Sequence, residues 1–154
     1  MSRLDRGFTL IELMVVTVVI ALIAAIAIPN MLRSRMTANE GAAAGAMRLI
    51  CSAEITFQAA DVNKTPERVS LYGDLGDLGA TDPPFIDNIL SSGFKQGYTF
   101  AAIPGLDGGA PFFTATAVPS DPGKTGIKSY YVDESGTIRF EGDGSTATVE
   151  SSPL

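Results

Sequence analysis

The chain has 154 residues, a formal net charge of −6, no histidine and one cysteine. These absences exclude Ser-His-Asp and Cys-His catalytic sites, zinc sites built from the usual ligand sets, and an intrachain disulfide. Beyond residue 61 there are twelve acidic and six basic residues, so this part carries the net negative charge and offers no basic face for nucleic acid. We therefore expect no enzyme, no metal, no cofactor and no direct nucleic-acid partner.

The most informative stretch is an apolar run near the N-terminus. It comprises 21 residues, 8–28, of which Glu12 is the only charged one. A helix of that length covers roughly 31 Å, which is about one hydrocarbon core. The leader before it, residues 1–7, is net positive, which favours a cytoplasmic N-terminus. A carboxylate near the end of such a helix is costly in lipid, so we expect Glu12 to have a partner.

The residues at the start of this run form a motif. Gly7-Phe8-Thr9-Leu10-Ile11-Glu12, followed by the apolar run and Pro29-Asn30, resembles the class III signal of type IV prepilins and pseudopilins. The resemblance implies cleavage between Gly7 and Phe8 by a prepilin peptidase, and N-methylation of Phe8 as the new first residue. It also implies that Glu12 pairs with the N-terminal amine of a neighbouring subunit. Gly7 suits cleavage because, without a Cβ, its backbone can be approached closely.

The same resemblance implies an assembly and a location. The chain would cross the bacterial inner membrane once and then join a homo-oligomeric helical filament, either an extracellular pilus or a periplasmic pseudopilus. Its partners would be a prepilin peptidase and N-methyltransferase, an inner-membrane platform, ATPases and an outer-membrane pore. Many pilins close a C-terminal loop with a disulfide, and this chain departs from that pattern. We expect packing and hydrogen bonds to hold that region instead.

Three other interpretations remain open. The chain resembles pseudopilins of type II secretion as much as pilins at its N-terminus. A plain membrane anchor would let Glu12 reach the lipid headgroups. A secretory signal peptide is suggested by Ala25-Ile26-Ala27, a small-x-small box that would release a soluble domain after Ala27. Against the signal peptide stands Glu12, which would lie within its apolar region.

A second helical pattern follows the apolar run. Pro29 removes one helical hydrogen bond and crowds the preceding turn, so we expect a kink in a helix that continues; the alternative is that Pro29 ends it. Small and apolar residues then recur at three- and four-residue spacing, which predicts an amphipathic helix to about residue 60. These residues are Ala43, Ala46, Met47, Ile50, Ala53, Phe57 and Ala60. Cys51 lies beside this stripe, and we expect it to be buried, with an intermolecular thiol as the alternative.

The rest of the chain predicts a head of loops and strands. Residues 61–97 are rich in Asp, Gly, Pro and Ser and predict a loop, with one short helix over 84–90 capped by Asp82. Strand patterns follow at 98–103, 112–118, 129–132 and 137–140, and the end, 142–154, is expected to fray. We therefore expect an α+β fold, with a long N-terminal helix packed on a four-stranded antiparallel sheet. Its parts would be a cleaved leader (1–7), a transmembrane or filament-core helix (8–28), an amphipathic continuation (29–60) and a globular head (61–154).

Overall fold

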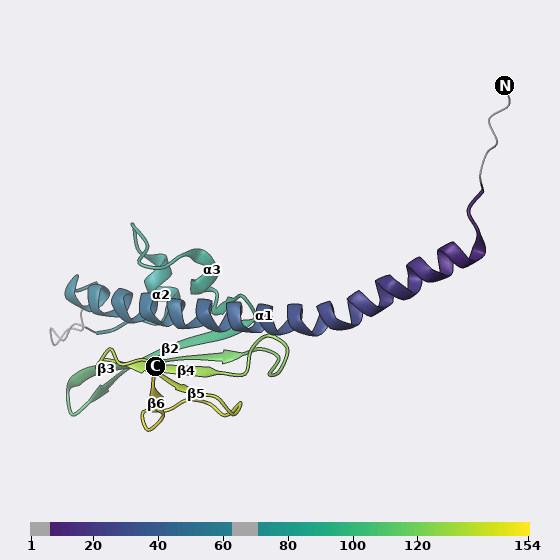
Figure 1. The fold of residues 1–154 in the computed structure, drawn as a ribbon. Helices are drawn as coiled ribbons and strands as arrows, with labels where there is room; N and C mark the ends of the chain where they lie inside the picture. Colours follow the sequence, from purple (N-terminus) through teal and green to yellow (C-terminus); the bar gives the residue numbers. More distant parts are fainter. Residues whose placement is uncertain (1–6, 63–70) are drawn as a thin grey trace. The chain divides into compact units, whose positions relative to one another are not determined.

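The computed structural model describes residues 7–62 and 71–154. Most of the expected leader, 1–6, and part of the expected loop, 63–70, lie outside the described residues. The chain divides into two compact units, Met1–Arg35 and Met36–Leu154, and we call the second one the head. Helix α1 (Leu10–Ala59) begins in the first unit and ends in the head (Figure 1).

Helix α1 contains Pro29 and continues past it. Proline therefore does not end the helix, although it lacks the N–H that would bond to the preceding turn. The kink at Pro29 stays a prediction. By length and composition, α1 includes a stretch apolar enough to cross a membrane, and none of that stretch is buried.

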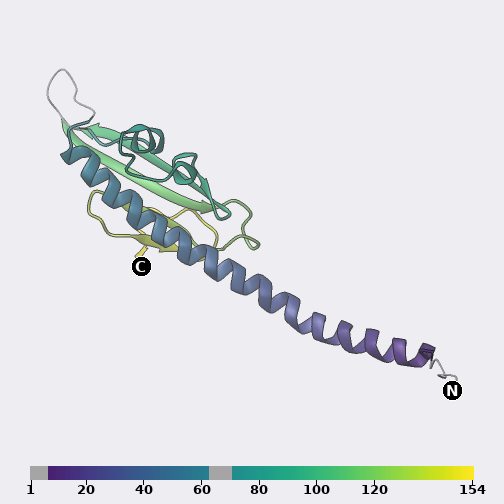
Figure 2. The same ribbon diagram turned by 90° about the horizontal axis from the view of Figure 1, so that it is seen from above.

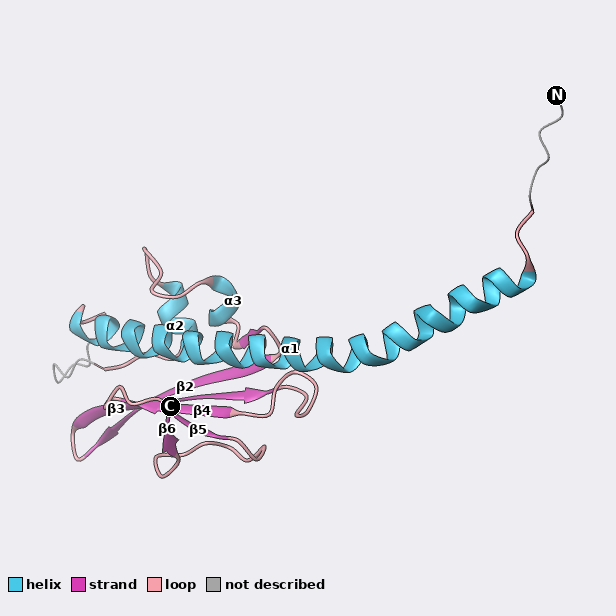
Figure 3. Ribbon diagram, in the orientation of Figure 1, coloured by secondary structure: helices cyan, strands magenta, loops and turns pink. Residues whose placement is uncertain are grey.

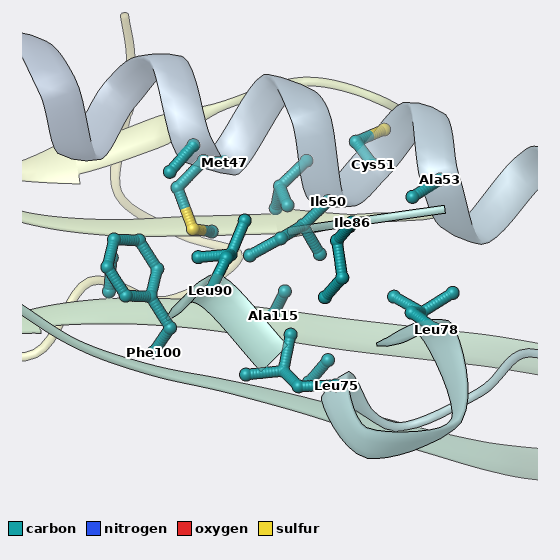
Figure 4. Packing of buried hydrophobic residues seen from close by; sticks show 14 of the residues in the cluster. Met47, Ile50, Cys51, Ala53, Leu75, Leu78, Ile86, Leu90, Phe100 and Ala115 are labelled. Atoms are coloured by element: carbon teal, nitrogen blue, oxygen red, sulfur yellow. The ribbon is translucent and has the colours of Figure 1, made fainter. Parts of the chain in front are cut away.

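Within the head, α1 buries its predicted stripe. Met47 and Ile50 are fully buried, and Leu90, Phe100 and Ala115 lie opposite them in the core (Figure 4). Burying a side chain of this size contributes about 1.5–3 kcal/mol, so these contacts attach the helix to the sheet. The other stripe positions that are buried are Ala43, Ala46, Ala53 and Phe57, while Ala60 is exposed. Cys51 is buried beside them, as expected.

The sheet is an antiparallel meander with six strands, so the expectation of four is wrong. Figures 2 and 3 show the head part of α1 lying along this sheet. The two additional strands, β1 and β6, contain two residues each, which is too short to leave a period-two pattern in the sequence. The strands are β1 (Phe94–Lys95), β2 (Tyr98–Asp107), β3 (Ala110–Pro119), β4 (Ser129–Asp133), β5 (Arg139–Glu141) and β6 (Ser152–Pro153).

Two short helices lie in the region expected to be mainly loop. Helix α2 (Leu75–Ala80) was not expected, because its glycines suggested a turn. It forms because Leu75 and Leu78 are buried on one face and because Asp74 and Asp77 make a capping box at its start. Helix α3 (Asn88–Ser91) is capped by Asp87, so the expected start at Asp82 is wrong.

The C-terminal segment is held in place, so the expectation that it frays is wrong. Ser129 is buried on β4, and its hydroxyl accepts from the Ala147 N–H at 2.8 Å and donates to the Ser145 carbonyl at 2.5 Å. The Arg139 guanidinium donates to the Ser151 carbonyl at 3.1 Å. One buried hydroxyl satisfying two backbone groups can fix a polar segment that has little apolar surface. Hydrogen bonds from Ser129 and Arg139 therefore hold this segment, which has no disulfide.

Candidate functional site

The predicted cleavage site is exposed and lies outside regular secondary structure. Gly7, Phe8 and Thr9 precede α1 and belong to no helix or strand, and the Phe8 side chain is 83% exposed. A methyl group on the Gly7 Cα would meet no atom of the described residues within 4 Å. The fold of this chain therefore gives no steric reason for a glycine at position 7. A requirement for glycine there would have to come from an enzyme that approaches the backbone closely.

Glu12 forms a capping box with Thr9 at the start of α1. The Glu12 N–H donates to the Thr9 hydroxyl at 3.2 Å, and the carboxylate Oε2 accepts from the Thr9 N–H at 3.3 Å and from its hydroxyl at 3.2 Å. These bonds satisfy N–H groups that an α-helix leaves free at its start. A negative charge in the first turn is also favoured by the helix dipole. Glu12 is thus held close to the backbone where cleavage would create an amine.

The helix beyond Glu12 presents an apolar surface on every side. From residue 8 to residue 28 every side chain is exposed except Ala24, which is half-buried. A hollow of about 380 Å³ runs along one side, lined by Ile11, Met14, Val15, Val18 and Val19. A helix that is apolar all round needs lipid or other helices as its surroundings. Its one charged group, Glu12, lies one turn from the candidate cleavage site.

The head contains one buried carboxyl that the sequence did not single out. Glu54 on α1 is fully buried, its Oε2 accepts from the Gly73 N–H at 3.0 Å, and its Oε1 has no hydrogen-bond partner among the described residues. Burial raises the pKa of Glu54 to about 7, aided by the nearby carboxylates of Asp77 and Asp74 and opposed by the Gly73 bond. The sequence signal for the burial of Glu54 is its spacing. It lies four residues after Ile50 and three residues before Phe57, which both belong to the buried stripe.

The remaining predicted features give no chemical site. Burial, followed by the charges of Asp133 and Glu54, raises the pKa of Cys51, which disfavours a reactive thiolate. In the described ranges, no group of three metal-ligating side chains comes together. The aspartates of the Gly-rich stretch act instead as helix caps at Asp74 and Asp87.

Comparison with known proteins agrees with this arrangement. A family model described as "Prokaryotic N-terminal methylation motif" matches residues 2–28. The Type IV wide pilus major component PilA4 of Thermus thermophilus is 32% identical over 114 residues, covering 74% of this chain and 83% of that protein. The chain belongs to the type IV pilin family. No solved structure matches this pilin significantly.

Two further relatives match smaller parts of this pilin. The Type IV major pilin protein PilA of Myxococcus xanthus is 35% identical over 78 residues, which is 45% of this chain and 36% of the relative. The ComG operon protein 3 homolog of Bacillus licheniformis is 31% identical over 70 residues, which is 46% of this chain and 72% of the relative. Gly7, Phe8 and Glu12 all fall within the segment that the methylation-motif model matches.

Proposed function

We propose that this pilin is the structural subunit of a type IV pilus, cleaved after Gly7 and N-methylated at Phe8. The observation that carries the proposal is the placement of Glu12. It is the one charged side chain in an exposed apolar helix surface, and it lies in the first turn after an exposed Gly7–Phe8 bond. The relatives named as pilus components support the choice of a pilus.

Cleavage would create a cationic partner for Glu12. The new amine of Phe8 stays cationic after methylation, and it would lie in apolar surroundings. Leaving one side of a buried ion pair empty costs about 3–5 kcal/mol, so a subunit would be favoured only where its Glu12 reaches a neighbour's amine. The pair would then set the axial offset between adjacent helices. Because each copy offers one surface and receives another, the contact is heterologous and can continue as an open helical filament.

The same apolar surface serves two environments in this proposal. Before assembly, residues 8–28 hold the subunit in the inner membrane with its N-terminus in the cytoplasm. After assembly they pack against other copies in the filament core, and the head lies outside the cell. The peptidase and N-methyltransferase, the assembly platform, the ATPases and the outer-membrane pore are the partners that this pathway requires.

The alternative is a pseudopilin of a type II secretion system. It would share the same N-terminus, processing and helix packing, so the two are separated by where the filaments are found. Filaments recovered by shearing cells support the pilus. Filaments that stay in the periplasm, together with normal processing, favour the pseudopilin.

The experiment that tests the proposal replaces Glu12 by Ala in the full chain. We expect normal cleavage and methylation but at least tenfold less assembled filament, because the subunit no longer has a carboxylate for the neighbour's amine. The matched control is Ser52→Ala in the exposed part of α1, which should leave assembly unchanged. Normal assembly of the Glu12→Ala chain would show that the proposed pairing is wrong.

A further inference from the structure

The meander of the head places three lysines at one end of the sheet and three carboxylates toward the other. Strand β2 has ten residues, so its own two ends are about 33 Å apart. One end carries the β1–β2 turn and the β3–β4 loop, with Lys95, Lys124 and Lys128. The β2–β3 turn at the opposite end follows Asp107. The β4–β5 turn follows Asp133, which pairs with Thr114 about halfway along β3, and includes Glu134; neither turn contains a lysine or arginine.

The acidic end is hollowed into a groove of about 640 Å³. The lining residues that matter are Leu106, Asp107, Phe112, Asp133, Glu134 and Val149, and we call this surface the acidic groove. Leu106 and Val149 are each about half exposed, so apolar area lies in water beside carboxylates. A lysine fits such a groove, because its aliphatic stem can cover apolar surface while its ammonium reaches a carboxylate.

The shape of the acidic groove is fixed by a contact across β2 and β3. Phe112 pairs with Gly105 in the strand register. The aromatic ring lies so close to Gly105 that a Cβ there would be 2.4 Å from the ring Cζ atom. The ring therefore rests on the glycine, and the aromatic wall of the groove is formed before any partner binds.

The opposite end offers a rigid projection, residues 121–128, which we call the lysine loop. Asn39 Nδ2 donates to the Thr125 carbonyl at 2.9 Å, and Glu40 Oε1 accepts from the Ile127 N–H at 2.9 Å and the Lys128 N–H at 3.3 Å. The loop presents Lys124 and Ile127 to solvent, and Ile127 is 42% exposed. A loop that is already ordered loses little conformational entropy when it binds.

We propose that, in the filament, the lysine loop of one subunit docks in the acidic groove of the next copy of this chain. Lys124 then faces the carboxylates of Asp107 and Glu134, and Ile127 covers the apolar floor of the groove. The inference rests on the proposed function, because it needs a filament that brings opposite ends of two heads together. The contact joins unlike surfaces, so it can repeat from copy to copy, as an open helical filament requires.

Charge complementarity selects a second copy as the occupant. The groove lining contains three carboxylates and no cation among the described residues, whereas the lysine loop itself carries two lysines and one aspartate, Asp121, with the Glu40 carboxylate of α1 bonded to its backbone. Lys124 contacts Asp121 at 2.8 Å, but both side chains are largely exposed, so this pair contributes little and can be exchanged for a new one. Packing of the N-terminal helices would also raise the local concentration of heads around one another.

Cross-linking tests this contact directly in assembled filaments. Lys124→Cys combined with Glu134→Cys should give a ladder of disulfide-linked multimers when sheared filaments are treated with a mild oxidant, because the two thiols come from adjacent copies. Each single variant should stay monomeric, since Cys51 is buried. The control pair is Lys124→Cys with Gly142→Cys, because Gly142 is exposed and a side chain there meets no atom within 4 Å. That pair should give no ladder.

A charge exchange provides an independent readout. Lys124→Glu and Glu134→Lys should each lower the yield of intact filaments at moderate salt by severalfold, and the double variant should restore most of it. Filaments with a normal Phe8 N-terminus that show no ladder and no rescue would overturn this contact and leave the proposed function standing. Absence of any wild-type filament would overturn both.

Discussion

Thr9 and Glu12 cap one another at the start of α1, with the Glu12 N–H on the Thr9 hydroxyl at 3.2 Å and the Thr9 N–H on the Glu12 carboxylate at 3.3 Å. The carboxylate that is proposed to find an amine on a neighbouring subunit thus also orders the first turn of its own helix. Because both roles use the same side chain, loss of assembly in an alanine variant has two possible causes. Capping needs only a hydrogen-bond acceptor, whereas pairing with an amine needs a charge.

Glu12→Gln separates these two roles. Glutamine keeps the acceptor and can complete the capping box, but it is neutral. We expect normal cleavage and at least a tenfold loss of filament, measured as the sheared fraction relative to total mature subunit. Thr9→Ser serves as the control, because serine keeps the hydroxyl that accepts from the Glu12 N–H. Wild-type assembly of the glutamine variant would assign the role of Glu12 to capping alone.

Gly7→Ala should block processing without changing the fold. A methyl group at position 7 meets no atom within 4 Å in the part of the chain that the structure describes, so we attribute a loss of cleavage to the approach of the peptidase. We expect the mass spectrum of the membrane fraction to show mainly uncleaved precursor, at least tenfold above wild type. Gly41→Ala is the matched control, since Gly41 is exposed in α1 and also has no atom within 4 Å. Efficient cleavage of the Gly7→Ala chain would contradict this reasoning.

Glu54 should make the stability of the head depend on pH. Its pKa is raised to about 7 in the folded chain from 4.5, so the folded state binds the proton more tightly. The stabilisation is fully present below pH 4.5 and is lost as the pH rises through about 7. The difference amounts to about 3.5 kcal/mol at most, taking roughly 1.4 kcal/mol for each unit of pKa.

The measurement compares wild type with Glu54→Gln by chemical unfolding of the full chain in detergent at pH 5 and pH 8. We expect wild type to lose stability at pH 8 relative to the glutamine variant, because glutamine stays neutral. The difference between the two proteins isolates Glu54 from the other groups that titrate over this range. Equal pH dependence of the two would show that Glu54 titrates normally.

Ser129→Ala should release the C-terminal segment. The hydroxyl is buried and serves both the Ala147 N–H and the Ser145 carbonyl, and leaving such groups unsatisfied costs about 1–3 kcal/mol. We expect a lower unfolding midpoint and faster proteolysis between residues 142 and 154. Ser52→Ala, at an exposed position of α1, should change neither. Unchanged proteolysis in the Ser129→Ala chain would mean that other contacts hold the segment.

Helices and strands with a long repeating pattern of apolar residues were predicted correctly from the sequence. The stripe from Ala43 to Phe57 keeps its period for four turns, and the alternation in β2 and β3 is long enough to predict two paired strands. Short elements fixed by single side chains were not predicted. Strands β1 and β6 have no period to detect, and α2 depends on the buried Leu75 and Leu78 within a glycine-rich stretch.

The residues of the candidate site could be named from the sequence, and their roles in cleavage, methylation and pairing stay predictions. Gly7, Phe8 and Glu12 were named from one contiguous motif, because the predicted cleavage and pairing involve a short piece of chain. The capping partner Thr9 lies within that same motif but was not recognised as a cap. Glu54 was missed because its burial depends on Gly73, which is nineteen residues away and approaches it only in the folded head.

The proposed cleavage after Gly7 and methylation of Phe8 are tested most directly by the intact mass and N-terminal fragmentation of the subunit. The sample is the native sheared or membrane fraction. We predict a mature chain that begins at Phe8 and carries one added methyl group. A chain that begins at Ile28 would lack Glu12 and would contradict the filament proposal. In that case the protein would be a released domain, and the proposed pairing of Glu12 with a neighbouring amine could not occur.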